Sequence, residues 1–123
     1  MKKVITYGTY DLLHQGHINL LKRAKDLGDY LIVGVTNDNF DRERGKLNVR
    51  NNVLERVEAV KTTGIADQII IEDFVGQKID NIQKYDVDIF AIGFNQEKIF
   101  EYLYDYCKKS SFYHAWKDMT FSS

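Results

Sequence analysis

Several features that mark other classes of protein are missing from this sequence of 123 residues. It holds a single cysteine, Cys107, which excludes an internal disulfide, and nothing near it indicates a metal cluster or a catalytic thiol. Such sparse use of cysteine is typical of the reducing cytoplasm, where we expect this protein to act. There is no proline, no internal repeat and no low-complexity segment, so nothing marks a linker between domains.

Long apolar runs and an excess of charge of one sign are also absent. No stretch approaches the length that spans a membrane, and residues 1–8 hold too few apolar residues for a targeting signal. The 17 Lys and Arg nearly balance the 18 Asp and Glu, so we expect neither a membrane nor a nucleic acid polymer as partner. Anionic ligands must therefore be bound by a few local residues. With 44% hydrophobic residues, the chain suits one α/β core.

Short β-branched segments alternate with amphipathic segments along the chain. Buried strands, rich in β-branched and aromatic residues, are predicted over 4–7, 29–35, 67–71 and 87–93. Helices, in which apolar residues recur at helical spacing, are predicted over 17–27, 52–62, 75–84 and 97–106. Residues 36–50 show no usable period and are predicted to form a long loop, while 112–116 are compatible with a terminal edge strand. This order predicts a single-domain α/β fold, a Rossmann-like doubly wound parallel sheet.

The carboxyl end of the first predicted strand is the strongest candidate for a ligand site. Doubly wound sheets bind ligands outside the carboxyl ends of their strands, and the chain here turns from Gly8 into a helix. The N-terminus of a helix presents unpaired amides and a partial positive charge, so it binds phosphate without help from side chains. No glycine-rich dinucleotide fingerprint is present, which argues against an oxidoreductase.

Two histidines, His14 and His17, begin this helix on either side of Gly16. At this spacing both imidazoles can converge on one ligand, and the glycine lets the backbone approach it closely. Phosphoryl transfer depends mainly on positioning and electrostatics, so hydrogen-bond donors suffice and no nucleophilic side chain is needed. On spacing alone, such a pair is more often an ordinary helix start or an incidental pair than a catalytic site. Its place after a buried strand favours a phosphate site.

The first turn reads TYGTYDLLHQGH over residues 6–17, followed by LLKRAK over 20–25 and LGDYL over 27–31. This string closely resembles the glycerol-phosphate cytidylyltransferases, which belong to the wider HxGH nucleotidyltransferases, and the likeness extends to about Cys107. The resemblance implies transfer of CMP from CTP to glycerol phosphate, giving CDP-glycerol and pyrophosphate. It also implies Mg²⁺ carried by the nucleotide phosphates without dedicated protein ligands, and a homodimer. CDP-glycerol would point to teichoic acid or capsular polymer biosynthesis.

The resemblance further implies roles for individual residues. The catalytic residues would be His14, His17, Lys46 and Arg56. The nucleotide would be bound by Thr9, Tyr10, His14, His17 and Lys46. The acceptor would be bound by Asp11, Arg44 and Lys78. Three of these assignments have plain alternatives: Asp11 as a residue that caps the helix or orders the turn, the basic loop around Arg44 as a solvated charge run, and Lys78 as an exposed lysine.

The sequence also departs from that family at three places. Gly64 stands where an arginine is usual, and Gly93-Phe94-Asn95-Gln96 replaces a segment close to Gly-Asp-Asp-Trp. Residues 108–123 lack the Arg-Thr-x-Gly-Ile-Ser-Thr-Thr-like segment, so we divide the chain into a nucleotidyltransferase domain over 1–107 and a divergent tail. Two alternatives therefore remain beside the leading hypothesis. One is cytidylyl or adenylyl transfer to another phosphorylated small molecule, and the other is a catalytically weakened nucleotide-binding protein.

Overall fold

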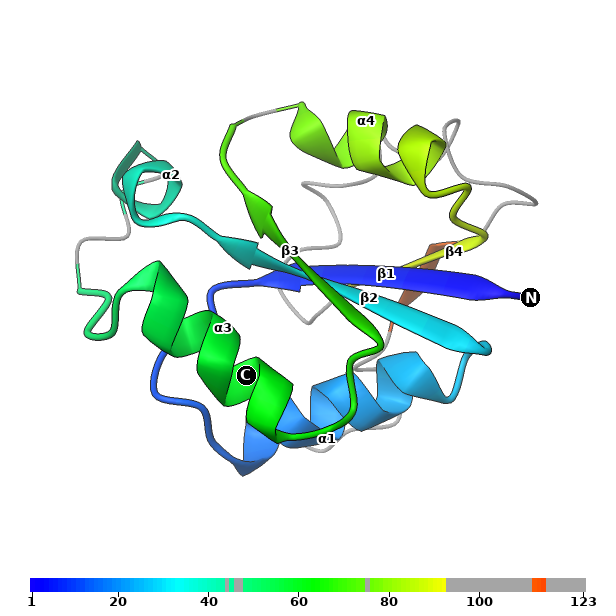
Figure 1. Cartoon of the computed structure of the whole chain (residues 1–123), viewed down its shortest axis with the longest axis horizontal. Helices are drawn as coiled ribbons and strands as arrows, with labels where there is room; N and C mark the ends of the chain where they lie inside the picture. Colours follow the sequence, from blue (N-terminus) through cyan, green and yellow to red (C-terminus); the bar gives the residue numbers. More distant parts are fainter. Residues whose placement is uncertain (44, 46–47, 75, 93–111, 115–123) are drawn as a thin grey trace.

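The computed structural model describes residues 1–43, 45, 48–74, 76–92 and the backbone of 112–114. Five parallel strands form one sheet in the order β3-β2-β1-β4-β5 (Figure 1). The strands are β1 Lys3–Gly8, β2 Tyr30–Thr36, β3 Gln68–Glu72, β4 Ile89–Ile92 and β5 Phe112–His114. The strand order therefore reverses beside β1, which is where sheets of this kind bind ligands. The parallel α/β sheet predicted from the sequence is confirmed, and so is a terminal edge strand.

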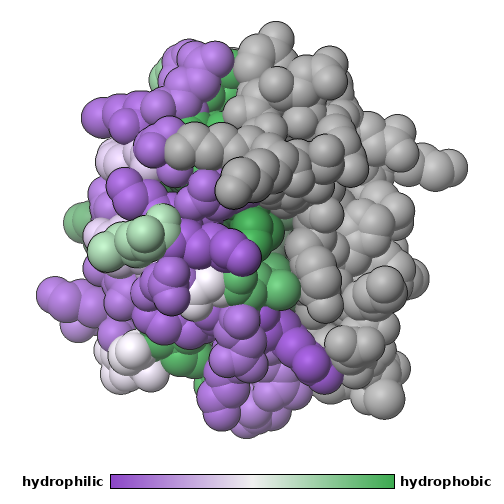
Figure 2. Space-filling model, turned by 90° about the vertical axis from the view of Figure 1, so that its right-hand side faces the viewer, coloured by the Kyte–Doolittle hydropathy of each residue, from purple (hydrophilic) through white to green (hydrophobic). Residues whose placement is uncertain are grey.

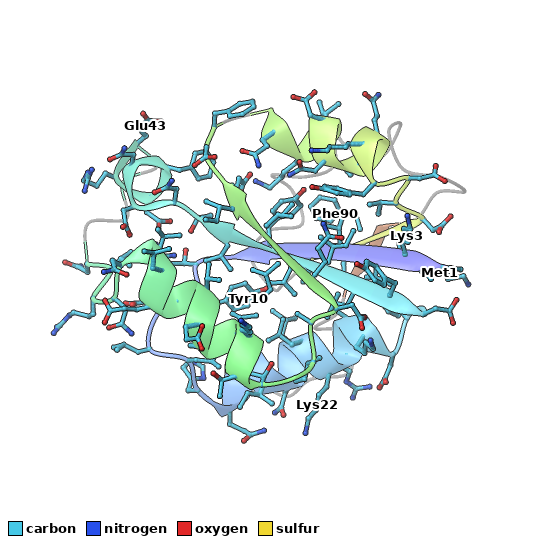
Figure 3. The ribbon with its side chains drawn as sticks, in the orientation of Figure 1. Met1, Lys3, Tyr10, Lys22, Glu43 and Phe90 are labelled. Atoms are coloured by element: carbon cyan, nitrogen blue, oxygen red, sulfur yellow. The ribbon has the colours of Figure 1, made fainter. Side chains whose placement is uncertain are left out.

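Helices cover both faces of the sheet (Figure 1). The helices are α1 Gln15–Lys25, α2 Asp38–Glu43, α3 Val53–Thr62 and α4 Gln77–Lys84. On one face, Leu21 and Ala24 of α1 and Val60 of α3 share a buried cluster with residues of β1 and β2. On the other face, Ile82 of α4 packs in a second cluster with Phe90. Figure 3 shows Tyr10 and Phe90 on opposite sides of the sheet, one in each cluster.

The two central strands are apolar because both of their faces are covered. Val4 and Ile5 of β1 and Val33 of β2 are fully buried, each against one of the two clusters. Tyr7 of β1 lies opposite Gly34 of β2, and a Cβ atom at Gly34 would stand 2.3 Å from the Tyr7 ring. Glycine is therefore required at this position so that the tyrosine can lie across the neighbouring strand.

The prediction of a long loop over residues 36–50 was wrong for the first half of this segment, which contains α2. Its anchors, Phe40 and Asp41, are buried, and the Thr36 hydroxyl donates to the Asp41 carboxylate over 2.6 Å. Six residues with one apolar anchor are too short for a helical period to show in the sequence. In addition, α1 begins two residues earlier than predicted because His14 caps it. The helix predicted over 97–106 lies outside the described residues.

Among the residues with described positions, no helix has both the length and the apolar character needed to cross a bilayer. The amino ends of the strands lie at the right of Figure 1, and this side faces the viewer in Figure 2. There the described surface is mainly hydrophilic, with hydrophobic atoms gathered in a central patch. The candidate site lies at the opposite end, where β1 and β2 finish.

Candidate active site

The chain between β1 and α1 makes a strained turn. Tyr10 and Leu12 have φ angles of 55° and 48°, in the left-handed region that costs an L-residue roughly 1–2 kcal/mol. The Tyr10 side chain is 2% exposed and packs over Gly8, where a Cβ atom would stand 2.9 Å from its ring. Burial raises the pKa of the Tyr10 hydroxyl. The buried ring thus anchors a backbone conformation that the turn would not adopt alone.

His14 and His17 form a capping box at the start of α1. Nδ1 of His14 accepts the N–H of Gly16 over 2.9 Å, and Nδ1 of His17 accepts the N–H of His14 over 3.1 Å. The centroids of the two rings are 4.0 Å apart. Because each Nδ1 accepts a hydrogen bond, the proton of each neutral ring sits on Nε2. Both imidazoles therefore keep an Nε2–H donor for a ligand at this helix end.

His17 is an uncharged donor at neutral pH. Burial, and after it the neighbouring His14, lower the pKa of His17 to about 4, against the opposing effect of the Asp11 carboxylate. The rings of Tyr10 and His17 meet in an edge-to-face contact, with their centroids 5.7 Å apart. His17 can thus stabilise negative charge by donating a hydrogen bond, without bringing a full positive charge of its own.

Asp11 ties the turn to the chain that leads into α3. Its two carboxylate oxygens accept the backbone N–H groups of Arg50 and Asn51, each over 2.8 Å. Partial burial alone would raise the pKa of Asp11, but these two donors hold it below its usual value. The cap of α1 is His14, so of the alternatives considered for Asp11 the structure shows the ordering of the turn. A contact between Asp11 and the acceptor stays a prediction.

Arg56, which was predicted to be a catalytic residue, has a completely buried side chain. Nε donates to the carbonyl of Asn51 over 2.9 Å, and Nη1 donates to the carbonyl of Thr9 over 2.9 Å. Nη2 lies 2.8 Å from Asp38 and 3.2 Å from Asp41. All of these contacts lie within the protein, and a catalytic role for Arg56 stays a prediction.

The sequence prediction missed the two aspartates of α2 that bind Arg56. Asp41 is 1% exposed and also accepts hydrogen bonds from the hydroxyls of Thr36, over 2.6 Å, and Thr9, over 3.4 Å. Asp38 accepts the N–H of Val53 at the start of α3 over 3.2 Å. Their spacing of three residues, which places both on one helix face, was the available signal.

Lys78 is buried, so the prediction of an exposed lysine was wrong. Only 5% of Lys78 is accessible, and its ammonium group forms an ion pair with the buried Glu72 at the end of β3. The ammonium group also lies 4.9 Å from the ring centroid of Tyr7 and 5.6 Å from that of Phe40. Two aromatic faces and a carboxylate therefore stabilise this buried cation. Its predicted contact with an acceptor is untested.

Two of the predicted basic residues, Arg44 and Lys46, lie outside the described residues. The described chain on either side of them borders a polar groove of about 280 Å³ between α2 and the start of α3, lined in part by Arg42, Arg50 and Asn52. No group of three or more His, Cys, Asp or Glu side chains within the described parts of the chain is placed to hold a metal ion.

Comparison with known proteins identifies relatives of this chain. The family model described as cytidylyltransferase-like matches residues 5–117. Glycerol-3-phosphate cytidylyltransferases from Bacillus spizizenii and Staphylococcus aureus are each 45% identical to this chain over 88% of its length, covering 83% and 81% of theirs. An FAD synthase from Thermococcus sibiricus is 36% identical over 76% of this chain and 64% of its own.

A solved structure also shares the fold. The crystal structure of a lipopolysaccharide core biosynthesis protein from Thermoplasma volcanium superposes with a TM-score of 0.76 at 26% identity, covering 91% of this chain and 93% of that protein. The family match spans the strained turn, the histidine pair and every element of the sheet except the first residues of β1. This chain belongs to the cytidylyltransferase-like family.

Proposed function

We propose that this protein transfers CMP from CTP to glycerol phosphate, which yields CDP-glycerol and pyrophosphate. The observation that carries the proposal is the histidine pair at the N-terminus of α1, whose Nδ1 atoms are both engaged by backbone amides. The 45% identity to glycerol-3-phosphate cytidylyltransferases supports this choice of nucleotide and acceptor. The pair then supplies two Nε2–H donors at a helix end that already favours phosphate.

The proposed reaction is a single in-line displacement at the α-phosphorus of CTP. A phosphate monoester has its second pKa near ~6, so the acceptor is already an ionised nucleophile at neutral pH and needs no general base. An acceptor oxygen forms a bond to the α-phosphorus while the bond to the bridging oxygen breaks, and pyrophosphate leaves with that electron pair. His14 and His17 donate hydrogen bonds to the phosphate oxygens as negative charge shifts toward the leaving group. The backbone of Thr9 and Tyr10 lines the α-phosphate.

Mg²⁺ enters this proposal on the nucleotide and supplies charge neutralisation for the leaving pyrophosphate. Because the carboxylates nearest the turn already bind other groups of the protein, they fit a Mg²⁺ ion that is held by the nucleotide and not by protein ligands. Both oxygens of Asp11 accept backbone amides, and Asp38 and Asp41 contact the guanidinium of Arg56. Oxygens of the triphosphate are the ligands that Mg²⁺ usually prefers at such sites.

The remaining predicted residues have roles on the acceptor and phosphate side of the proposal. Arg44 and Lys46 belong to the segment that links α2 to α3, and we assign them to the acceptor phosphate and the nucleotide phosphates respectively. Lys78 is assigned to the acceptor, for which its ammonium group would have to exchange Glu72 for phosphate. We further propose a homodimer that acts in the cytoplasm and provides CDP-glycerol for teichoic acid or a related polymer.

Release of pyrophosphate tests the proposal directly. Purified protein is incubated with Mg²⁺, CTP and glycerol phosphate. Three control pairs replace these substrates: CTP with choline phosphate, ATP with glycerol phosphate, and ATP with flavin mononucleotide. The last pair is included because FAD synthases are also relatives of this chain. Pyrophosphate release with CTP and glycerol phosphate is the expected result. Release only with ATP, or CTP binding without release from any pair, would reject it.

A further inference from the structure

Arg56 joins three chain segments that surround the first turn. Its guanidinium contacts Thr9 in the turn, Asp38 and Asp41 in α2, and Asn51 in the chain before α3. None of its side chain is exposed, so a ligand in the site would meet the segments that Arg56 holds and not Arg56 itself. The planar guanidinium is suited to such a junction because its N–H donors have fixed relative directions, so each donor orients the acceptor that it binds.

The contact with Thr9 fixes the orientation of one particular peptide group. Nη1 of Arg56 holds the Thr9 carbonyl over 2.9 Å, and no peptide bond in the described chain is cis. In a trans peptide the carbonyl of one residue and the N–H of the next point in opposite directions. Arg56 therefore turns the N–H of Tyr10 away from itself. Tyr10 has a left-handed φ of 55°, so this orientation depends on external contacts.

We propose that Arg56 is a positioning residue that aims the backbone N–H of Tyr10 at the α-phosphate by holding the Thr9 carbonyl from the opposite side. The inference rests on the proposed function, which supplies the α-phosphate at this turn. Asp38 and Asp41 hold the guanidinium from the side of α2, so Arg56 is itself fixed in place by two carboxylates. A donor fixed in advance contributes more to the transition state than one that must reorient.

The substitution Arg56→Lys tests the proposal because it keeps the positive charge but removes the planar set of N–H donors. We expect kcat/KM for CTP to fall about a hundredfold, the typical cost of losing one preorganised backbone or amide donor. The KM for glycerol phosphate should stay within about twofold, since no acceptor contact changes. Arg23→Lys on the exposed surface of α1 is the matched control, with unchanged kinetics. A KM for glycerol phosphate that rises as strongly as kcat/KM for CTP falls would show general damage to the site and overturn the proposal.

Nuclear magnetic resonance of the Tyr10 amide separates this proposal from the proposed function. In the wild-type protein CTP should shift the Tyr10 amide resonance strongly and leave the Arg56 Nε resonance nearly unchanged. In Arg56→Lys the Tyr10 amide should resonate differently and exchange faster before any ligand is added. If Arg56→Lys does not fold, Asp38→Asn should move the same resonance in the same direction by less.

Each outcome of that measurement has a defined meaning. A Tyr10 amide that is identical in the wild type and the variants overturns the proposal, whether or not the protein releases pyrophosphate from CTP. A large shift of the Arg56 Nε resonance on adding CTP to the wild type would indicate direct contact and would also overturn it. Absence of pyrophosphate release with an altered Tyr10 amide would reject the proposed function alone.

Discussion

The backbone N–H of His14 donates to Nδ1 of His17 over 3.1 Å, so the first histidine of the pair sets the tautomer of the second. The tautomer of His14 is set in the same way, because its Nδ1 accepts the N–H of Gly16. One capping box therefore performs two tasks, because it satisfies free amides of α1 and leaves both Nε2–H groups for a ligand. The capping role and the catalytic role are separable by substitution.

The substitution His14→Asn should separate the capping role of His14 from its catalytic role. Asparagine is among the best N-cap residues, and its side-chain oxygen can replace Nδ1 as the acceptor for Gly16. The variant should keep its thermal stability and lose turnover about a hundredfold, since the Nε2–H donor is gone. His14→Ala removes both and should also lose about 1 kcal/mol of stability. Differential scanning calorimetry and pyrophosphate release measure the two effects. Full turnover in His14→Asn would contradict the role of this donor.

His17 should make stability depend on pH. Its pKa is about 4 in the folded protein against an ordinary value of 6.5, so between these values the unfolded chain binds more protons. The stabilisation is therefore complete above pH 6.5, declines as the pH falls and is lost below about 4. His17→Asn keeps an acceptor near the Nδ1 position but does not titrate.

The difference in melting temperature between wild type and His17→Asn, followed across this pH range, measures the effect. We expect the wild type to lose more stability than the variant as the pH falls. A constant difference would place the pKa of folded His17 near its ordinary value. Direct titration of the His17 ring protons by nuclear magnetic resonance provides the independent check.

The buried pair of Lys78 and Glu72 should show strong coupling. Removing one partner leaves the other charge buried, which typically costs about 3–5 kcal/mol, so Lys78→Met and Glu72→Gln should each destabilise strongly. The double variant should lose less than the sum of the single losses. Urea unfolding of the four proteins yields the coupling energy.

The half-exposed pair of Lys25 and Asp67 serves as the control for this cycle. Pairs of that kind contribute about 0–1 kcal/mol, so the corresponding cycle should yield a small coupling energy. Coupling energies of equal size in the two cycles would argue against a special role for burial. The KM of Lys78→Met for glycerol phosphate, if the variant folds, then tests its assignment to the acceptor.

Asp11→Asn should loosen the chain that precedes α3. Asparagine keeps one acceptor oxygen but turns an N–H₂ group toward a backbone donor, so one of the two bonds to Arg50 and Asn51 is lost. We expect a loss of about 1 kcal/mol in urea unfolding, with an unchanged slope, together with reduced turnover. Asp29→Asn, which affects one bond to Lys2 at the other end of the sheet, should leave turnover unchanged. Equal turnover in both variants would refute the link.

The sheet, the first turn and the family were all predictable from the order of the amino acids. Strands β1 to β4 were predictable because a sheet covered on both faces needs continuous apolar runs, which leave a local signature. The histidine pair was predictable because its spacing and its place after a strand are both local. The strained backbone of Tyr10 left no such signal, since tyrosine is common in ordinary extended chain.

The partners of the charged residues could be found only in the folded chain. Sequence reasoning predicted roles for Arg56 and Lys78 but not their surroundings, and both side chains are buried and paired with carboxylates. Those carboxylates come from α2 and from the end of β3, segments brought to the site only by the parallel crossovers of the sheet. The partners of a charge depend on contacts distant in sequence, and periodicity carries no information about them.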